Sequence, residues 1–409
     1  MASVTGASVL TQLPARRGCA VVHDGDATVV ACAPDEVRTA SGEAAFALLD
    51  QAGREGFWVG YLAYDLGRSV ERIHARIADD LDIPDVVLAR YDSRLVLRPG
   101  ADPEIVGTGS QSRELARAAW RAQRADVPAC HGMHASWVSS LDHGAHRAAV
   151  EAVMELLEAG ECYQVNLTRR LMTMESADPI ALFRALDASN PAPHAALCTF
   201  GPGGPDVAIV SASPELFLRV DDRMVTSRPI KGTAIDRAWL ERSVKDHAEN
   251  VMIVDLARND LGRVCEFGSI EVPELCAVEA HPGLHHLVST VVGRLRRDVG
   301  IAELVRATFP PASVTGAPKP RVLQAIEDLE PVRRGVYCGA IGWIDGDRSR
   351  TELSVAIRTF TIAGGTTSLG VGGGIVADSR PDAEWTETEL KASRLLAAAS
   401  GAVAGASIR

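Results

Sequence analysis

The sequence has no pair of cysteines at C-x-x-C spacing. Its eight cysteines are scattered over 409 residues. Zinc sites and thioredoxin-like redox motifs depend on closely spaced cysteines, so neither is indicated. A chain of this length also buries a sizeable core without disulfide bonds. We therefore expect buried, reduced thiols in a cytoplasmic protein.

Long apolar runs and dense runs of lysine or arginine are missing too. Without a stretch of about 18 apolar residues, no membrane span is expected. The first residues, MASVTGASVLTQLPARRG, do not show the basic and then apolar pattern of a signal peptide. The formal net charge of −11 argues against nucleic acid or an anionic membrane as the main partner. A small anionic ligand stays compatible, because a binding site needs only local positive charge.

What is present is the composition of a soluble globular protein, with strands that cluster as hairpins. Because helices do not alternate strictly with these strands, an α+β fold with antiparallel sheets is favoured over a doubly wound one. We predict a β-rich N-terminal subdomain over residues 1–95, a linker with a helical connection over 96–138, and the main domain over 139–409. The pattern predicts one long helix over 240–264 and strands over 207–220 and 352–362.

Two sets of acidic residues fall at helical spacing. Glu384, Glu387 and Lys391 lie three and seven residues apart, so they share one helix face. Because Glu and Lys four residues apart are common on surface helices, an exposed ion pair is an equally simple interpretation.

Asp246 and Glu249 share a helix face as well, and Glu249 is followed by the apolar residues 251–254. A carboxylate beside such a run is expected to be partly desolvated and to need a partner. Mg²⁺, held by one or two carboxylates with several waters kept, would supply one. A salt bridge to Lys245 or Arg258 is the alternative.

Three further motifs are less specific. The glycine-rich stretch GVGGGIV (370–376) either presents backbone N–H groups to an anion or forms a bulge or tight turn. GAPK (316–319) lacks the Walker spacing, so nucleotide hydrolysis is not indicated. His285 and His286 are adjacent on a predicted strand and point to opposite faces, so at most one of them enters a site.

Lys231 stands in the stretch SRPIKGT (227–233). One interpretation is a solvated lysine at a turn. The other is a lysine held against a substrate by a stiff strand end, with Gly232 allowing a close approach. The stretch by itself leaves both interpretations open.

Nine segments follow one another over about residues 140–400: GECYQVNLTRR, SASPELFLRV, SRPIKGT, KDHAENVMIVDLARNDLGR, LHHLVST, ASVTGAPKPR, RRGVYCGAIGW, ELSVAIRT and GGGIVADSRPDAEWTETELKA. Taken in this order, they closely resemble the chorismate-binding enzymes. This family includes anthranilate synthase component I, aminodeoxychorismate synthase component I, and the isochorismate and salicylate synthases.

The resemblance implies a fold, a cofactor and a set of site residues. The implied fold is a large sandwich of two antiparallel β-sheets flanked by helices, with the active site in the cleft between the sheets, and residues 139–409 as the chorismate-binding catalytic domain. The implied cofactor is Mg²⁺. Its matching carboxylates are Glu249 and Glu387, supported through water by Asp246 and Glu384. The groups that match contacts to chorismate are Arg358, Lys391, the N–H groups of Gly372 and Gly374, Tyr337, His286 and Ser313. Glu215 matches the acid that protonates a departing hydroxyl, a role that suits a raised pKa.

Lys231 distinguishes the branches of this family. Anthranilate synthases have P-I-A-G-T at this place, whereas many aminodeoxychorismate synthases have P-I-K-G-T, as here. The resemblance implies that Lys231 attacks C2 of chorismate and that ammonia then attacks C4, which requires a lysine with a lowered pKa. Gln164 stands where the water-using branches have a lysine base, so hydroxylation at C2 is disfavoured.

The predicted activity is therefore the Mg²⁺-dependent conversion of chorismate and ammonia to 4-amino-4-deoxychorismate, for 4-aminobenzoate and folate. No glutaminase segment is present, so a separate glutaminase subunit is expected to supply ammonia from glutamine. Anthranilate synthase component I is the alternative within the family. A catalytically inactive chorismate-binding or scaffold subunit for a glutaminase is the alternative of another class.

Overall fold

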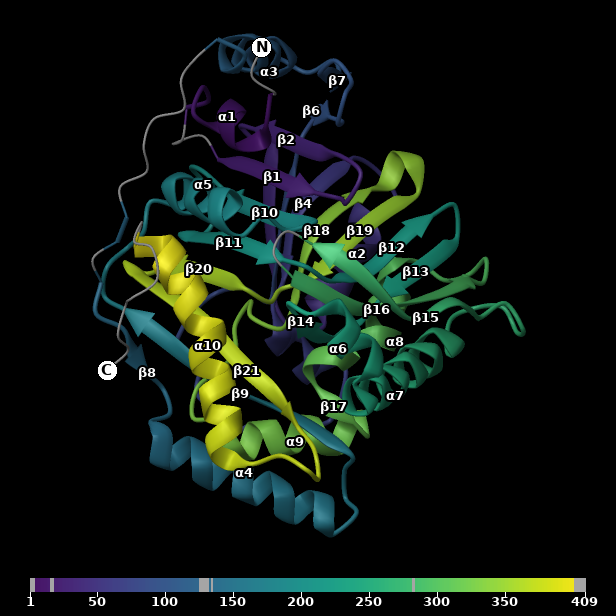
Figure 1. Ribbon diagram of the computed structural model, residues 1–409. Helices are drawn as coiled ribbons and strands as arrows, with labels where there is room; N and C mark the ends of the chain where they lie inside the picture. Colours follow the sequence, from purple (N-terminus) through teal and green to yellow (C-terminus); the bar gives the residue numbers. More distant parts are fainter. Residues whose placement is uncertain (1–3, 15–17, 125–131, 134, 282–283, 401–409) are drawn as a thin grey trace.

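The computed structural model describes residues 4–14, 18–124, 132–133, 135–281 and 284–400. In this part of the chain, two large sheets lie face to face and helices cover their outer sides (Figure 1). Neighbouring strands run antiparallel in every pairing within both sheets. The predicted sandwich of two antiparallel sheets flanked by helices is confirmed.

The first sheet has 11 strands in the described residues, in the order β17-β9-β21-β20-β11-β10-β1-β2-β6-β7, with β8 also paired to β9. Its strands are β1 (Cys19–His23), β2 (Thr28–Cys32), β6 (Ser93–Leu97), β7 (Glu104–Gly107), β8 (Val138–Ser139), β9 (Gln164–Thr173), β10 (His194–Thr199), β11 (Val207–Ser213), β17 (Gly316–Ala317), β20 (Thr359–Ala363) and β21 (Thr366–Ile375).

The second sheet has 10 strands over the same described ranges, in the order β14-β16-β13-β12-β19-β18-β4-β5-β3, with β15 also paired to β16. Its strands are β3 (Glu36–Ala40), β4 (Phe57–Leu62), β5 (Val86–Arg90), β12 (Leu216–Asp221), β13 (Met224–Arg228), β14 (Ile230–Ala234), β15 (Glu271–His281), β16 (Leu284–Arg294), β18 (Ala340–Asp345) and β19 (Arg350–Val355).

The helices cover the outer faces of the two sheets, and α10 packs along β21 and against α4 and α5 (Figure 1). The α-helices are α1 (Gly6–Leu10), α2 (Ala44–Ala52), α3 (Ser112–Ala122), α4 (His143–Glu158), α5 (Pro179–Ser189), α6 (Arg237–Arg242), α7 (Val244–Gly262), α8 (Ile301–Thr308), α9 (Lys319–Leu329) and α10 (Pro381–Ser400). Short 3₁₀ turns are η2 (Tyr64–Ser69), η3 (Ala312–Val314) and η4 (Gly346–Arg348). Among these helices, none has the length and apolar character that crossing a membrane requires.

Central strands of both sheets, such as β4 and β11, are buried on both faces, which explains their nearly continuous apolar sequences. In β4, Phe57, Val59 and Tyr61 point into the core between the sheets. The alternate residues Trp58 and Leu62 point outward into the core under the helices. The period of two thus separates the inner core from the outer cores.

Strands from the first hundred residues belong to the same two sheets as strands from the last hundred: β1 lies in the sheet of β20 and β21, and β4 pairs with β18. The predicted linker region contributes β7 and α3. How the chain divides into domains stays a prediction.

The single helix predicted over 240–264 is wrong, because the helix breaks at Ser243. This residue has an extended ψ of 98° and caps α7, accepting the backbone N–H of Asp246. Serine favours such caps because its hydroxyl satisfies an N–H that has no partner within the helix. The break separates α6 from α7 and places Asp246 in the first turn of α7.

The strands predicted over 207–220 and 352–362 each divide into two strands that belong to different sheets. The chain leaves β11 in the first sheet, passes Pro214 and Glu215, and enters β12 in the second. It later leaves β19 in the second sheet and enters β20 in the first, with Arg358 in the left-handed region at φ 52°. Proline cannot donate to a strand ladder, which accounts for the first division.

Candidate active site

The two crossings between the sheets lie side by side and place Glu215 and Arg358 together. Backbone hydrogen bonds tie them: Val355 N–H donates to the Glu215 carbonyl at 3.0 Å, and Ala212 N–H donates to the Arg358 carbonyl at 3.0 Å. A carboxyl and a guanidinium are thus held by main chain at the line where the sheets meet.

Lys231 lies on β14 beside a bulge. Its strand pairs with β16, and the register shifts between Lys231 and Thr233. Gly232 in the bulge has φ +78°, and a Cβ there would lie 2.9 Å from the Cβ of Asp246 on α7. Glycine is therefore needed at this position both for its backbone conformation and because α7 approaches so closely. The partly buried Lys231 is not a solvated turn lysine.

Lys231, Glu215 and Ser313 form what we call the inner corner. The Lys231 Nζ lies 3.4 Å from the Ser313 carbonyl oxygen. The Glu215 carboxyl accepts hydrogen bonds from the Ser313 side chain and from the backbone N–H of Ile230. Glu215 is 4% exposed.

Burial shifts both titratable groups of the inner corner toward their neutral forms. It raises the pKa of Glu215 to about 7, although the Ser313 hydrogen bond and the nearby Lys231 charge act in the opposite direction. It lowers the pKa of Lys231, against the attraction of Glu249 and Glu215. An acid that keeps its proton and an amine that loses its proton are the pair that acid catalysis and nucleophilic attack require.

A small cavity of about 30 Å³ lies behind Glu215. Leu216, Ile253, Ala257 and Pro311 give it mainly apolar walls. Its volume has room for about one water. The apolar walls explain why the Glu215 carboxyl is so strongly desolvated.

What we call the outer rim consists of Glu249 on α7 and of Glu387 and Lys391 on α10. Burial raises the pKa of Glu249, and the negative charge of Glu387 contributes to the same shift. Burial also pushes the pKa of Glu387 upward, but the Lys391 ammonium beside it holds that pKa below its ordinary range. The side chains of Glu387 and Lys391 stay 52% and 48% exposed, so they line an open face.

Both ion pairs that the spacing allowed are present at the outer rim. The Lys391 Nζ lies 2.6 Å from a Glu387 carboxylate oxygen, and the Lys245 Nζ lies 3.8 Å from one of Glu249. The predicted alternative partner of Glu249, Arg258, pairs with Asp255 instead. Lysines thus partly balance carboxylates that face one another.

The glycine-rich stretch is the end of strand β21, paired with β9, and is neither a loop nor a tight turn. Lys391 donates to the Gly372 carbonyl at 2.8 Å. A Cβ at Gly373 would lie 3.3 Å from a carboxylate oxygen of Glu384 and 3.6 Å from one of Glu387. The glycines therefore let α10 bring its carboxylates against the strand. Gly374 lies beside the buried amide of Gln164.

His286 belongs to the same region as a neutral side chain. It is 2% exposed, and its Nδ1 lies 2.8 Å from the Thr233 hydroxyl. Burial lowers its pKa to about 3, helped by the positive charge of Arg358. Its neighbour His285 is half-buried and bonds the Ile235 carbonyl, so the two histidines do point to opposite faces.

Arg358 is a partly buried cation whose guanidinium makes no hydrogen bond or ion pair with any residue in the described ranges. Burial lowers its pKa, and the charge of Arg394 adds to that shift. A desolvated guanidinium with no carboxylate partner fits a site for an anion, because its fork matches a carboxylate.

Tyr337 lies farther from the inner corner. A Cβ at Gly370 would lie 2.1 Å from its ring, so the ring packs directly on β21. It shares a small cavity with Arg170, Glu330 and Arg334. No contact in the described part of the chain joins Tyr337 to Lys231 or Glu215.

The residues fit a magnesium ion as an open site. No three His, Cys, Asp or Glu side chains within the described ranges lie close enough together to hold a metal by themselves. Mg²⁺ needs only one or two carboxylates, with waters and ligand oxygens completing its shell. A cation would offset the mutual repulsion of Glu249 and Glu387. It would also favour the charged form of Glu384, whose pKa burial raises.

Some residues of this region were not expected from the sequence. Ser379 donates to a carboxylate oxygen of Glu384 at 2.6 Å and so orients it. The buried Asn250 donates to the Leu287 carbonyl at 3.1 Å and ties α7 to β16. Their only signal was position: each lies within five residues of a predicted carboxylate.

Comparison with known proteins agrees with this geometry. The family model described as "chorismate binding enzyme" matches residues 11–397. The chain belongs to the chorismate-binding enzymes. This confirms the family that the sequence motifs indicated.

Relatives of this chorismate-binding enzyme carry two kinds of name. It is 40% identical over 349 residues to "Aminodeoxychorismate synthase component 1" of Klebsiella aerogenes, covering 83% of this chain and 76% of that protein. It is 37% identical over 373 residues to "Anthranilate synthase component 1" of Thermus thermophilus, covering 85% and 78%. The solved anthranilate synthase component I of Streptococcus pneumoniae TIGR4 is similar with a TM-score of 0.81 and 25% identity, over 91% of this chain and 92% of that one.

Proposed function

We propose that this protein is the synthase component that converts chorismate and ammonia to 4-amino-4-deoxychorismate and water. The observation that carries the proposal is the inner corner, where the Lys231 amine lies 3.4 Å from the Ser313 carbonyl and is close to the buried acid Glu215. The 40% identity to an aminodeoxychorismate synthase component 1 supports the same branch.

Chorismate carries two carboxylates, and the site offers separated cations for them. Arg358 stands at the sheet crossing without a carboxylate partner in the described residues, and Lys391 stands at the outer rim. The N–H groups of Gly372 and Gly374 are further candidates. The predicted set is completed by His286, Ser313 and Tyr337. We assign Glu249 and Glu387 as the residues that hold Mg²⁺, with Asp246 and Glu384 in support. Bound Mg²⁺ would neutralise a substrate carboxylate and fix its orientation.

The first chemical step uses both groups of the inner corner. The neutral Lys231 amine forms a bond to C2 of the ring, the two double bonds shift, and the C4–O bond breaks. Glu215 gives its proton to the departing hydroxyl, which leaves as water, and the proton that the attached Lys231 nitrogen then loses returns to the Glu215 carboxylate. A pKa of about 7 keeps this carboxyl protonated at neutral pH for a useful fraction of the time.

The second step reverses the shift. Ammonia bonds to C4, the double bonds return, and the C2–N bond to Lys231 breaks. The proton that the new ammonium group loses replaces the one that the lysine needs to leave as an amine. The sum is chorismate plus ammonia giving aminodeoxychorismate plus water.

A partner that supplies ammonia is part of this proposal. The Klebsiella and Thermus relatives are both named "component 1", which supports a second component. We assign that component as a separate glutaminase that releases ammonia from glutamine. Ammonium salts at high pH should replace this glutaminase, because the species that attacks C4 is neutral ammonia.

Anthranilate synthesis is the second candidate, because a 37% identical relative is an anthranilate synthase component 1. In that reaction ammonia attacks C2 directly and no lysine nucleophile is needed. The lowered pKa of the Lys231 amine beside Glu215 favours 4-amination. A catalytically inactive scaffold is the third candidate, and two opposed pKa shifts in one buried corner count against it.

Product identification tests the proposal. Purified protein is incubated with chorismate, Mg²⁺ and ammonium at about pH 8.5. The products are separated by chromatography and identified from their masses by mass spectrometry. We expect a non-aromatic product with the mass of chorismate in which one hydroxyl is replaced by an amino group. Fluorescent anthranilate would move the protein to the second candidate, and Mg²⁺-dependent chorismate binding without any product would move it to the third.

A further inference from the structure

Arg334 lies behind the inner corner and makes four hydrogen bonds through its guanidinium. Two go to the Glu330 carboxylate, at 2.6 and 2.9 Å. One goes to the Val314 carbonyl at 2.9 Å and one to the Asn166 carbonyl at 2.6 Å. The side chains of Arg334 and Glu330 are only 2% and 3% exposed. All four of these hydrogen bonds go to protein groups, so the guanidinium is placed to hold the chain around the site.

The bonds of Arg334 converge on the loop that carries Ser313. Val314 follows Ser313 directly, so the bond to its carbonyl fixes the peptide between Val314 and Thr315, one residue beyond Ser313. The same loop is fastened to β9 by the Asn166 N–H, which donates to the Thr315 carbonyl at 2.7 Å. Arg334 therefore joins strand β9 and the Ser313 loop into one unit.

Glu330 completes the clamp from the other side. Its Oε1 accepts the backbone N–H of Thr168 on β9 at 2.8 Å while it also accepts Arg334. A buried ion pair is weak evidence for stability, because desolvation of both charges offsets much of their attraction. Two of the four Arg334 hydrogen bonds go to carbonyls on two separate backbone segments, and the pair is better explained as a device for geometry.

We infer that Arg334 is a positioning residue for the reaction: it holds the Ser313 loop so that the Ser313 side chain meets Glu215 and the Ser313 carbonyl meets Lys231. This inference rests on the proposed function for its kinetic readout, but not for its structural one. Without the clamp the loop relaxes, and water reaches the cavity behind Glu215. The charged groups that face Glu215 are Lys231 on β14 and, across the cavity, Asp260 on α7.

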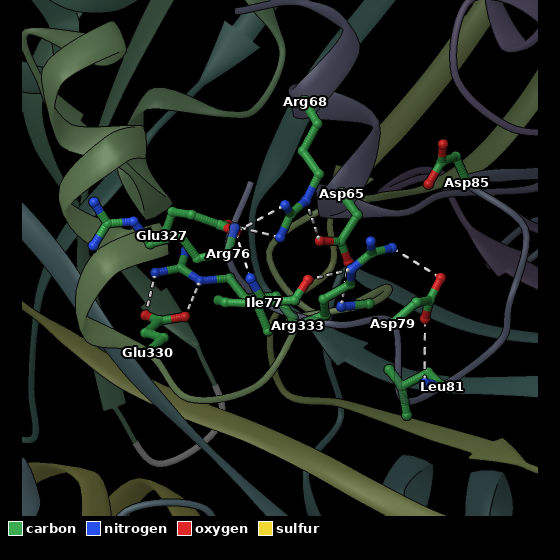
Figure 2. A network of polar contacts seen from close by, with 12 residues as sticks. Asp65, Arg68, Arg76, Ile77, Asp79, Leu81, Asp85, Glu327, Glu330 and Arg333 are labelled. Carbon is green, nitrogen blue, oxygen red and sulfur yellow. Dashed lines mark hydrogen bonds and ion pairs between the residues drawn. The ribbon is translucent and has the colours of Figure 1, made fainter. Parts of the chain in front are cut away.

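The chain supplies a matched control in Arg68. Figure 2 shows that Arg68 bridges Asp65 and Glu327 in the neighbouring part of the same polar network. Arg68 also grips a buried carboxylate with two nitrogens, at 2.7 and 3.0 Å from Glu327. Glu327 in turn accepts the backbone N–H groups of Arg76 and Ile77. The bonds of Arg68 thus fix the 65–77 region and none reaches the Ser313 loop.

The test compares Arg334→Lys with Arg68→Lys, because each keeps its charge and loses its fork. For each variant, kcat and KM for chorismate are measured with ammonium from pH 6 to 9. We expect Arg334→Lys to lower kcat about 10- to 100-fold with KM nearly unchanged, since positioning acts on the transition state. We also expect the limb of the pH profile assigned to Glu215 to move to lower pH as water enters. Arg68→Lys should lower the melting temperature but keep kcat and the limb.

A second readout does not depend on turnover. Stability against denaturant is measured at pH 5 and pH 8 for both variants and the parent chain, since burial of Glu215 makes stability fall over this range. In Arg334→Lys the free energy of unfolding should decrease less between pH 5 and pH 8 than in the parent. In Arg68→Lys it should decrease as much as in the parent. Equal effects of the two variants in both readouts would overturn the inference. If the parent makes no aminodeoxychorismate but the stability readout still separates the variants, the function has failed and the positioning role stands.

If Arg334→Lys does not fold, Glu330→Gln replaces it, because it weakens the clamp and leaves the bonds of Arg334 to the two carbonyls. We expect the same changes at a smaller size. A Glu330→Gln protein with the parent's kcat and the parent's pH limb would overturn the inference.

Discussion

The inner corner and the outer rim hold similar residues, a lysine beside glutamates, in opposite states. In the inner corner, burial lowers the pKa of Lys231 and raises that of Glu215. At the outer rim, Lys391 and Glu387 pair directly, and about half of each side chain is exposed. Solvent on one side of α10 sustains charge there, whereas the apolar wall behind Glu215 removes it.

This difference separates two kinds of work. Charged groups at the outer rim suit the binding of a metal ion and an anion, which need permanent charge. Groups close to neutrality in the inner corner suit proton transfer and covalent attack, which need a proton to move. Substitutions in the inner corner should therefore lower the rate of the reaction, and substitutions at the outer rim should weaken the binding of the metal ion and the substrate.

The largest effect is expected for Lys231→Ala, which removes the nucleophile of the inner corner. Turnover of chorismate with ammonium should fall by about 10³-fold or more. Chorismate affinity measured by calorimetry should stay close to that of the parent, because the ligand's carboxylates are held by other groups. Parent-like turnover in this variant would remove Lys231 from the mechanism, and loss of chorismate binding would make it a binding residue.

Glu215→Gln should have the next largest effect, lowering turnover about 10²- to 10⁴-fold, because an amide cannot give a proton to the hydroxyl. In the parent, kcat should fall as the pH rises through about 7, where Glu215 loses its proton. The variant should lose that limb. A parent-like limb in the variant would assign the proton to a different group.

The same variant has a second consequence, for stability. The pKa of Glu215 rises from an ordinary 4.5 when unfolded to about 7 when folded, so the folded chain holds more protons in that window. Below pH 4.5 the carboxyl is protonated in both states and does not affect the free energy of unfolding. Between pH 4.5 and 7 the free energy of unfolding falls by about 3 kcal/mol in all. Denaturant unfolding at pH 5 and 8 should show this fall in the parent and a smaller one in Glu215→Gln.

The sequence predicted which residues meet, because helical and strand periods place each on a face. Glu384, Glu387 and Lys391 do share a face of α10, and Lys231 does lie just after the end of a strand, β13, near the start of β14. It also predicted an antiparallel sandwich, through motifs that fix a whole family at once. Periodicity identifies the face of an element, and that information survives packing.

The sequence could not predict where strands change sheets. Segments 207–220 and 352–362 have apolar residues on both sides of their divisions, and no change of period marks the divisions. Pro214 interrupts the first segment, but it does not show that the chain changes sheet there. Glu215 and Arg358 owe their positions to those divisions. The role of Arg334 could not be predicted for a different reason. It acts on the Ser313 loop through the backbone carbonyls of Val314 and Asn166, and every residue type has a backbone carbonyl.

A smaller effect is expected at the outer rim, for Glu387→Gln. Deleting one charge that faces the ion should raise the Mg²⁺ concentration needed for chorismate binding by about 10- to 100-fold. Saturating Mg²⁺ should restore most of the turnover, unlike in the inner-corner variants. The measurement is chorismate affinity by calorimetry over a series of Mg²⁺ concentrations.

The matched control is Glu241→Gln on α6. Glu241 pairs with Arg237 at 2.7 Å, four residues apart, and the two are 47% and 59% exposed, much as Glu387 and Lys391 are. This surface pair should have no effect on the Mg²⁺ dependence. Equal Mg²⁺ dependence of the two variants would reduce Glu387 to the exposed ion pair that its spacing also allowed.

The smallest effect is expected for Ser243→Ala, which removes the N-cap of α7. Its hydroxyl accepts the Asp246 N–H and donates to the Asp246 carboxylate. The free energy of unfolding should fall by about 1 kcal/mol. Asp142→Ala, which uncaps α4, should cost a similar amount because Asp142 accepts the Ala145 N–H at 2.8 Å. Only the Ser243 variant should also weaken the Mg²⁺ dependence, by less than Glu387→Gln does, because only that cap orients a carboxylate beside the outer rim. Equal Mg²⁺ responses in the two cap variants would place Asp246 outside the metal site.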